Sequence, residues 1–135
     1  LQGEKTRGVE FKTNLMLTKA TDFVRGDPSP DGITATMKVA HVAEGLGLDV
    51  ELHASGPAQR HLMAAIRNSN YYEVVWVHPD LPNTHPPIYK GDYEDSLYAI
   101  DENGCVSVPQ GPGLGVEYDW DWVMAHRVDG TEYTA

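Results

Sequence analysis

Residues 22–53 read DFVRGDPSPDGITATMKVAHVAEGLGLDVELH, and this stretch decides the fold. The pattern predicts a strand over Asp22–Arg25, a helix over about Gly32–Leu46 and a second strand over Asp49–Leu52. Within the helix, apolar side chains recur at helical spacing, at Ile33, Met37, Ala40 and Ala43. A right-handed crossover makes two such strands parallel members of one sheet, with their carboxyl ends at the same edge.

One ionisable residue follows each of these two strands. Asp27 follows the first strand and His53 follows the second, so we expect the two side chains to lie side by side at that edge. A carboxylate beside an imidazole orients the ring and fixes its tautomer. The pattern therefore indicates a general base, without yet defining a reaction.

Polar residues at strand ends recur along the first half of the chain. They are Glu4, Asp27, His53 and Glu73, separated by 23, 26 and 20 residues. The intervening segments predict helices over about Thr6–Ala20 and Pro57–Asn68, and a further strand over Tyr71–Trp76. Units of a strand and a helix of this length build a (β/α)₈ barrel of ~250 residues, with its chemistry at the carboxyl ends of the strands. The sequence thus predicts an α/β fold equal to about half of such a barrel.

The chain beyond this repeat has a different character. Residues 78–87 form a Pro-rich stretch that predicts a loop. A turn signal at 101–104 predicts a hairpin between Leu97–Ile100 and Val106–Val108, and a short helix is expected from Asp119 to about Ala125. We therefore divide the chain into residues 1–76, the barrel half, and residues 77–135, a C-terminal segment that packs on the barrel and on an absent N-terminal domain. Because Leu1–Gly3 resembles the tail of a strand and no Met precedes it, we expect an N-terminal part upstream.

Composition excludes several classes of protein. The chain has 135 residues, of which 41% are hydrophobic, and its net charge of −10 argues against nucleic acid and anionic membranes as partners. No apolar run is long enough to span a membrane and no signal peptide is visible, and Cys105 is the only cysteine, so a cytoplasmic location is expected. An anionic small molecule remains compatible with this charge if a bound cation reverses the local sign.

Four motifs, taken in order and spacing, are specific together. They are Gly3-Glu4, DGITATMKVAHVAEGLGLDVELH over residues 31–53, Tyr72-Glu73, and VPQGPGLGVEYDWDWV over residues 108–123. With these motifs the sequence resembles the C-terminal half of the mandelate racemase/muconate lactonizing enzyme branch of the enolase superfamily. The resemblance covers nearly the whole chain. It implies strands five to eight of a (β/α)₇β barrel, followed by a C-terminal capping segment.

The resemblance also implies roles for the four strand-end residues. Glu4 matches a carboxylate ligand of an essential Mg²⁺, and Asp27 and His53 match the catalytic dyad. Glu73 matches the residue that hydrogen-bonds the substrate carboxylate. The other Mg²⁺ ligands are expected in the N-terminal part, and the full-length protein is expected to be a homo-oligomer. The chain departs from the family pattern at Pro30-Asp31-Gly32, where the family usually has paired glycines, and this leaves the register of the turn after Asp27 open.

The reaction that the resemblance implies is removal of the proton α to a carboxylate. The leading hypothesis is an acid-sugar dehydratase, which eliminates the β-hydroxyl to give a 2-keto-3-deoxy acid. A racemase, epimerase or cycloisomerase would share the first step, and a residue upstream of this chain would bear on which reaction follows. A hypothesis of a different class is that the chain is a non-catalytic half-barrel.

Overall fold

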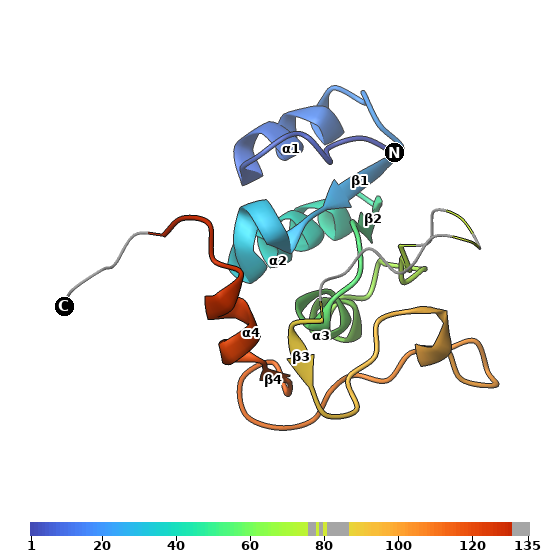
Figure 1. Ribbon diagram of the computed structural model, residues 1–135. Coiled ribbons are helices and arrows are strands. Elements are labelled where there is room, and N and C mark those ends of the chain that lie inside the picture. Colours follow the sequence, from blue (N-terminus) through green and yellow to red (C-terminus); the bar gives the residue numbers. More distant parts are fainter. Residues whose placement is uncertain (76–77, 79, 81–86, 131–135) are drawn as a thin grey trace.

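The computed structural model describes residues 1–75, 78, 80 and 87–130 (Figure 1). Its first part alternates helices and strands: α1 (Val9–Leu17), β1 (Phe23–Gly26), α2 (Pro28–Gly45), β2 (Asp49–Leu52) and α3 (Pro57–Ala65). Its second part holds β3 (Tyr89–Lys90), the 3₁₀ turn η1 (Leu97–Ala99), β4 (Glu117–Tyr118) and α4 (Trp120–Ala125). In the described ranges, no helix combines the length and the apolar character that a membrane span requires.

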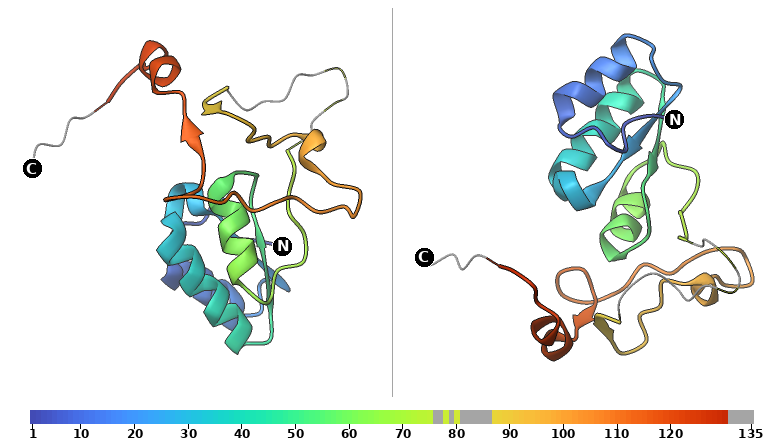
Figure 2. Two further views of the ribbon diagram at one scale, coloured as in Figure 1. Left: turned by 90° about the horizontal axis from the view of Figure 1, so that it is seen from below. Right: turned by 45° about the horizontal axis from the view of Figure 1, so that its top comes forward.

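Two parallel strands form the centre of the first part. β1 pairs with β2 in parallel, from Phe23 opposite Asp49 to Gly26 opposite Leu52, and Gln2 adds a parallel bridge to Val24 on the other edge of β1. Three segments that are consecutive in the repeat are therefore neighbours in space. Helices α1, α2 and α3 stack side by side, and the strands run along one side of this stack (Figure 2).

The core lies between the strands and these helices. Its buried apolar side chains are Met16, Val24, Val39, Ala40, Ala43 and Val50. Gly26 allows β1 to approach α2 closely, because a Cβ at this position would lie 3.1 Å from the Thr36 side chain and 3.0 Å from that of Leu52. The close approach sets the position of the chain immediately before Asp27.

Helix α2 begins four residues earlier than predicted, because Asp27 caps its N-terminus and Pro28 suits the first helical position. The helix then bends at Gly32, whose φ of 76° and ψ of 163° are not helical. The predicted start at Gly32 thus coincides with this kink. The buried face of the helix also differs from the prediction, since Ile33 is exposed while Thr36 and Val39 are buried.

Two predicted strand features are absent from the described residues. Residues 71–75 run extended but form no strand; Trp76, which would have ended this strand, and most of the Pro-rich loop lie outside the described residues. The predicted hairpin is replaced by η1 and a single bridge between Ile100 and Val106. Near residue 71, bonds to a side chain replace backbone strand pairing: the Glu51 carboxylate accepts hydrogen bonds from the Tyr71 N–H and from the Asn70 side chain.

Helix α3 is shorter than predicted and ends at Ala65, and α1 is shorter at both ends. Beyond α3, Asn68 bonds to the β2 region instead of continuing the helix. Its carbonyl accepts a hydrogen bond from the Val50 N–H at 2.8 Å, and its side-chain amide donates to Leu48 O at 2.8 Å. The C-terminal segment, residues 87–130, lies next to α3 at the end of the helix stack away from α1 (Figures 1 and 2).

Candidate active site

The junction between β1 and α2 fixes both oxygens of Asp27. Oδ1 accepts the Ser29 N–H at 2.9 Å and so caps α2, while Oδ2 lies 2.8 Å from Nδ1 of His53. The residue is buried, with 6% of its surface exposed. Because the capping bond and the burial leave Asp27 little freedom, its second oxygen presents a fixed acceptor to the imidazole.

His53 follows β2 and extends the parallel ladder by one bond, from its N–H to Gly26 O at 2.7 Å. This bond places the ring directly opposite Asp27. A carboxylate oxygen 2.8 Å from Nδ1 is an acceptor for the Nδ1 proton, and the tautomer that carries this proton leaves a lone pair on Nε2. The His53 side chain is 29% exposed, and its Nε2 lies at the carboxyl edge of the strands, 3.5 Å from Oε1 of Glu4.

Glu4 reaches the same edge from the first segment of the chain. Its Oε1 lies 3.5 Å from Nε2 of His53 and 3.4 Å from Nζ of the exposed Lys5. The preceding Gly3 has a φ of 114°, and a Cβ there would lie 3.2 Å from Arg25 O, so a larger residue would push the segment away from β1. The absence of a side chain at Gly3 therefore lets this segment approach β1 closely enough for Glu4 to lie near the imidazole.

Glu73 completes the group. Its Oε2 accepts hydrogen bonds from Nη2 of Arg25 and, at 3.3 Å, from the N–H of Ala54. Ala54 has a φ of 61°, a conformation that costs a non-glycine residue of order 1–3 kcal/mol and that clusters at functional sites. The chain immediately after His53 is thus strained and tied to Glu73.

The structure brings together all four residues that the sequence singled out, and the predicted contact between Asp27 and His53 is confirmed. The site also contains Arg25, which the sequence reasoning did not identify. Its signal was present: a strand alternates its faces, so Arg25, two residues before Asp27, lies on the same face of the strand. The catalytic and metal-binding roles of these residues stay predictions.

The side chains at this edge of the strands can supply only part of a divalent-cation site. The described residues hold no group of three or more His, Cys, Asp or Glu side chains arranged to bind a metal ion. Glu4 does fit the role of one ligand, because it offers a half-exposed carboxylate oxygen, the hard donor that Mg²⁺ prefers. A complete Mg²⁺ site would need further oxygen ligands from outside the described residues.

Parallel strands that alternate with helices and carry polar side chains at one edge are typical of part of a (β/α) barrel. Residues 1–122 match the family described as enolase C-terminal domain-like, and the chain therefore belongs to that family. This match confirms the enolase-superfamily resemblance and an α/β fold related to the barrel.

Two relatives make the placement more specific. The chain is 32% identical to a D-xylonate dehydratase from Haloferax volcanii, over 86% of this chain and 27% of that protein. It is similar in structure to a D-glucarate dehydratase from Agrobacterium tumefaciens, solved in complex with magnesium, with a TM-score of 0.72 and 30% identity. That match covers 90% of this chain and 31% of the solved one. The chain thus spans about three tenths of the length of these relatives.

Proposed function

We propose that this chain is the C-terminal part of a Mg²⁺-dependent acid-sugar dehydratase, a hydro-lyase. In this proposal Leu1–Gly3, β1, β2 and residues 71–76 are barrel strands five to eight. The contact between Asp27 and His53, made by an imidazole side chain that is 29% exposed, is the observation that carries the proposal. The names of the two relatives, D-xylonate dehydratase and D-glucarate dehydratase, support an acid sugar as the class of substrate.

His53 is the base in the proposed reaction. Its Nε2 takes the proton from the carbon α to the substrate carboxylate, and the electron pair of the broken C–H bond moves into the enolate. Asp27 holds the ring through Nδ1 and balances the charge of the imidazolium that forms. The 2.8 Å contact is already made, so the ring needs no reorientation for proton transfer.

The same imidazolium serves the second step. The bond between the β-carbon and its hydroxyl breaks, and the hydroxyl leaves with the proton that His53 returns, so the products are water and an enol. The enol then converts to the 2-keto-3-deoxy acid by moving its hydroxyl proton to carbon. One residue thus acts as base and then as acid, which requires that it return to its starting state after each turnover.

Glu73 and Glu4 support this chemistry in different ways. Arg25 and the Ala54 N–H both occupy Oε2 of Glu73, so contact with the substrate falls to Oε1. Glu4 would supply one ligand to Mg²⁺. When it is bound, the metal supplies positive charge beside the substrate carboxylate, where negative charge develops.

Racemases, epimerases and cycloisomerases share the proton-abstraction step. Elimination is favoured here because both relatives named above are dehydratases. A non-catalytic half-barrel would not require a buried carboxylate aligned on a partly exposed imidazole.

The test is His53→Asn in the complete enzyme, assayed on D-xylonate, D-glucarate and related acid sugars. Asn keeps one hydrogen bond to Asp27 but accepts no proton near neutral pH, so kcat should fall by ~10²–10⁴-fold or more. KM should change far less, because Glu73 and the metal still hold the substrate. The measurement is the rate of keto-acid release at saturating substrate.

The matched control is His41→Asn, which alters an exposed histidine on the outer face of α2 and should leave turnover unchanged. Turnover by the His53→Asn variant within about tenfold of the wild type would show that His53 is not the base. Absence of turnover by the wild type on the whole panel would reject the acid-sugar assignment itself.

A further inference from the structure

The segment that carries Glu73 has an unusual means of support. Residues 71–75 form no strand ladder, and hydrogen bonds that involve side chains hold this segment in place. The Tyr71 N–H bonds the Glu51 carboxylate at 3.3 Å, and Glu73 bonds Arg25 and the Ala54 N–H. The position of Glu73 therefore depends on contacts that single substitutions can remove.

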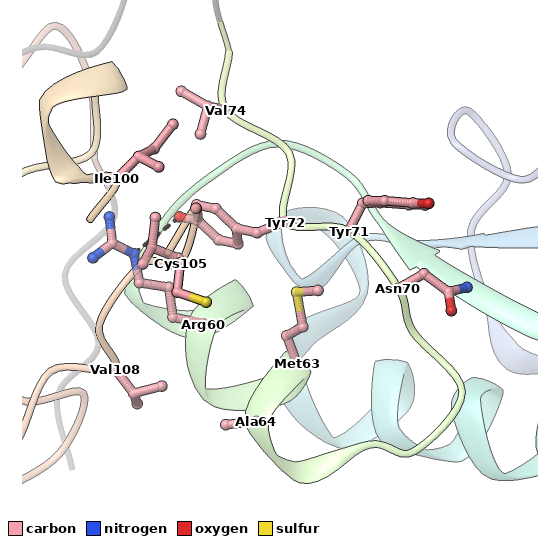
Figure 3. A pocket seen from close by; sticks show the side chains of 12 residues that line it. Arg60, Met63, Ala64, Asn70, Tyr71, Tyr72, Val74, Ile100, Cys105 and Val108 are labelled. Atoms are coloured by element: carbon pink, nitrogen blue, oxygen red, sulfur yellow. Dashed lines mark hydrogen bonds between the residues drawn. The ribbon is translucent and has the colours of Figure 1, made fainter. Parts of the chain in front are cut away.

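Tyr72, between these two residues, makes the most contacts. Its hydroxyl accepts hydrogen bonds from Nε of Arg60 at 3.2 Å (Figure 3) and from the Gly56 N–H at 2.8 Å, and it donates to Oδ1 of Asp95 at 2.6 Å. Burial and the Asp95 bond raise the pKa of Tyr72, so the phenol keeps the proton that it donates. One hydroxyl thus joins the loop after β2, helix α3 and the C-terminal segment.

Arg60 anchors the C-terminal segment to the same point. Its side chain is buried, and its two terminal nitrogens donate to Asp95 Oδ1 at 2.8 Å, Glu94 O at 2.6 Å and Ser107 O at 3.0 Å. The guanidinium also lies over the rings of Tyr72 and Tyr93. A buried cation with this many partners fixes geometry as well as charge. We refer to Tyr72, Arg60 and Asp95 as the Tyr72 cluster.

The Tyr72 cluster is connected to the candidate active site in two ways. Tyr72 and Glu73 are adjacent in the chain, so the contacts that fix Tyr72 also restrict where Glu73 can lie. Gly56 lies three residues after His53, in a loop where Ala54 has the strained φ of 61°. The Tyr72 hydroxyl therefore holds the loop after His53 and the segment before Glu73 in one arrangement.

We propose that Tyr72 is a positioning residue, and that docking of the C-terminal segment through Arg60 and Asp95 sets the relative placement of His53 and Glu73. This inference rests on the proposed function, since it assigns a consequence for turnover to a cluster that touches no substrate. Its prediction is specific: the C-terminal segment acts on catalysis through a single phenol hydroxyl.

The test is Tyr72→Phe in the complete enzyme, with Tyr98→Phe as the matched control. Tyr72→Phe keeps the ring but leaves the Gly56 N–H, Arg60 Nε and Asp95 Oδ1 each one partner short. Tyr98 lies in the same C-terminal segment and is 93% exposed, so removing its hydroxyl should not disturb the contacts of the Tyr72 cluster. Two readouts are taken from each variant: hydrogen exchange of the peptides covering 53–56 and 70–75, and kcat with KM.

Faster exchange of both peptides is expected in Tyr72→Phe and not in Tyr98→Phe. We expect kcat per folded molecule to fall between about tenfold and a hundredfold, with KM within about threefold of the wild type, because small misplacements of reacting groups act mainly on the chemical step. A merely structural role would lower the melting temperature and leave kcat of the folded fraction unchanged.

The two readouts separate the inference from the function on which it rests. Unchanged exchange in Tyr72→Phe would overturn the inference whatever the reaction is. Faster exchange with wild-type kcat would also overturn it, because the cluster would then hold the segment without serving turnover. If the wild type turned over no acid sugar, the proposed function would fail, and the exchange readout would still decide whether Tyr72 holds the two segments together.

Discussion

At the scale of single residues, the pair Arg25 and Glu73 shows how a site is built from two distant segments of the chain. Arg25 lies in β1, and its guanidinium donates to Glu73 while its own Nε is buried without a partner among the described residues. Without the Arg25 guanidinium, an anionic substrate near Glu73 would be repelled by the unpaired negative charge of the Glu73 carboxylate. Arg25 therefore makes a carboxylate compatible with binding another carboxylate.

Arg25→Met in the complete enzyme tests this role. Met keeps an apolar stem of similar length and removes the charge, so Glu73 retains only the weaker bond from Ala54 N–H. Hydrogen bonds to charged groups contribute ~1.5–3 kcal/mol, which predicts a fall of about tenfold to a hundredfold in kcat/KM. Arg67→Met is the control, since the Arg67 side chain, in the bend after α3, is 87% exposed and lies 3.6 Å from Glu44 of α2. Equal kcat/KM for wild type and Arg25→Met would show that the Arg25 charge does not contribute to substrate binding or turnover.

The sequence allowed Asp27 and His53 to be placed together because the crossover rule turns strand order into proximity. It did not reveal Arg25, because an arginine near a strand end is also common on solvated surfaces. Only the approach of residue 73, an interaction across 48 positions, distinguishes the two cases. Contacts of this kind depend on the tertiary fold and leave little trace in local pattern.

At the scale of elements, a buried ion pair joins α1 to the start of α2. Nζ of Lys12 lies 2.6 Å from Oδ2 of Asp31, and the two side chains are 0% and 3% exposed. The N–H of Gly8 also donates to Asp31, at 3.1 Å. Asp31 belongs to the Pro30-Asp31-Gly32 departure from the family pattern, and the kink at Gly32 turns this part of α2 toward α1.

Asp31→Asn should be strongly destabilising, by about 3–5 kcal/mol, because it leaves the Lys12 charge buried and unpaired. Burial alone would raise the pKa of the Asp31 carboxyl, but the hydrogen bonds from Lys12 and from the Gly8 N–H outweigh it and hold that pKa below its usual range. A lowered pKa in the folded state means that the stabilisation is complete above the unfolded pKa of ~3.9. It is then lost as the pH falls through the lower, folded value.

Melting temperatures of the complete protein, measured between about pH 3 and pH 7, check this sign. Wild type should lose stability below about pH 4, and Asp31→Asn should show a smaller loss over the same interval, because the group that titrates is gone. Asp22→Asn, at an exposed position, is the control. A variant as stable as the wild type at neutral pH would show that the pair contributes nothing net.

The elements themselves were predictable to different degrees. The crossover unit was predicted nearly as observed, because hydrophobic spacing and glycine signals are local properties of residues 22–53. The start of α2 was missed because Asp27-Pro28 fits a turn as well as a helix cap. A strand was predicted over Tyr71–Trp76, but a strand exists only through backbone pairing, and in the described residues 71–75 the Tyr71 N–H donates to a Glu51 side-chain oxygen instead.

At the scale of the whole molecule, the chain spans about three tenths of the length of its two relatives. β1 and β2 form a two-stranded sheet; within the described residues, the bridge between Gln2 and Val24 and the bond from the Val50 N–H to Asn68 O pair only part of its outer edges. Such edges favour association unless other strands cover them. The net charge of −10 also opposes an anionic substrate, so a bound cation at the site would serve binding as well as chemistry.

The last prediction follows from the number of ligands that this chain offers. Mg²⁺ is strongly hydrated and is held in proteins by several oxygen ligands, whereas the described residues hold no group of three or more His, Cys, Asp or Glu side chains that could bind it, and Glu4 is the proposed ligand. We therefore expect calorimetry to detect Mg²⁺ binding by the complete protein, at least about tenfold weaker binding by its Glu4→Gln variant, and no tight binding by this chain by itself. Glu10→Gln, an exposed position in α1, should bind like the wild type. Tight binding by the isolated chain would mean that the ligands lie within it, and unchanged binding by Glu4→Gln would mean that Glu4 is not among them.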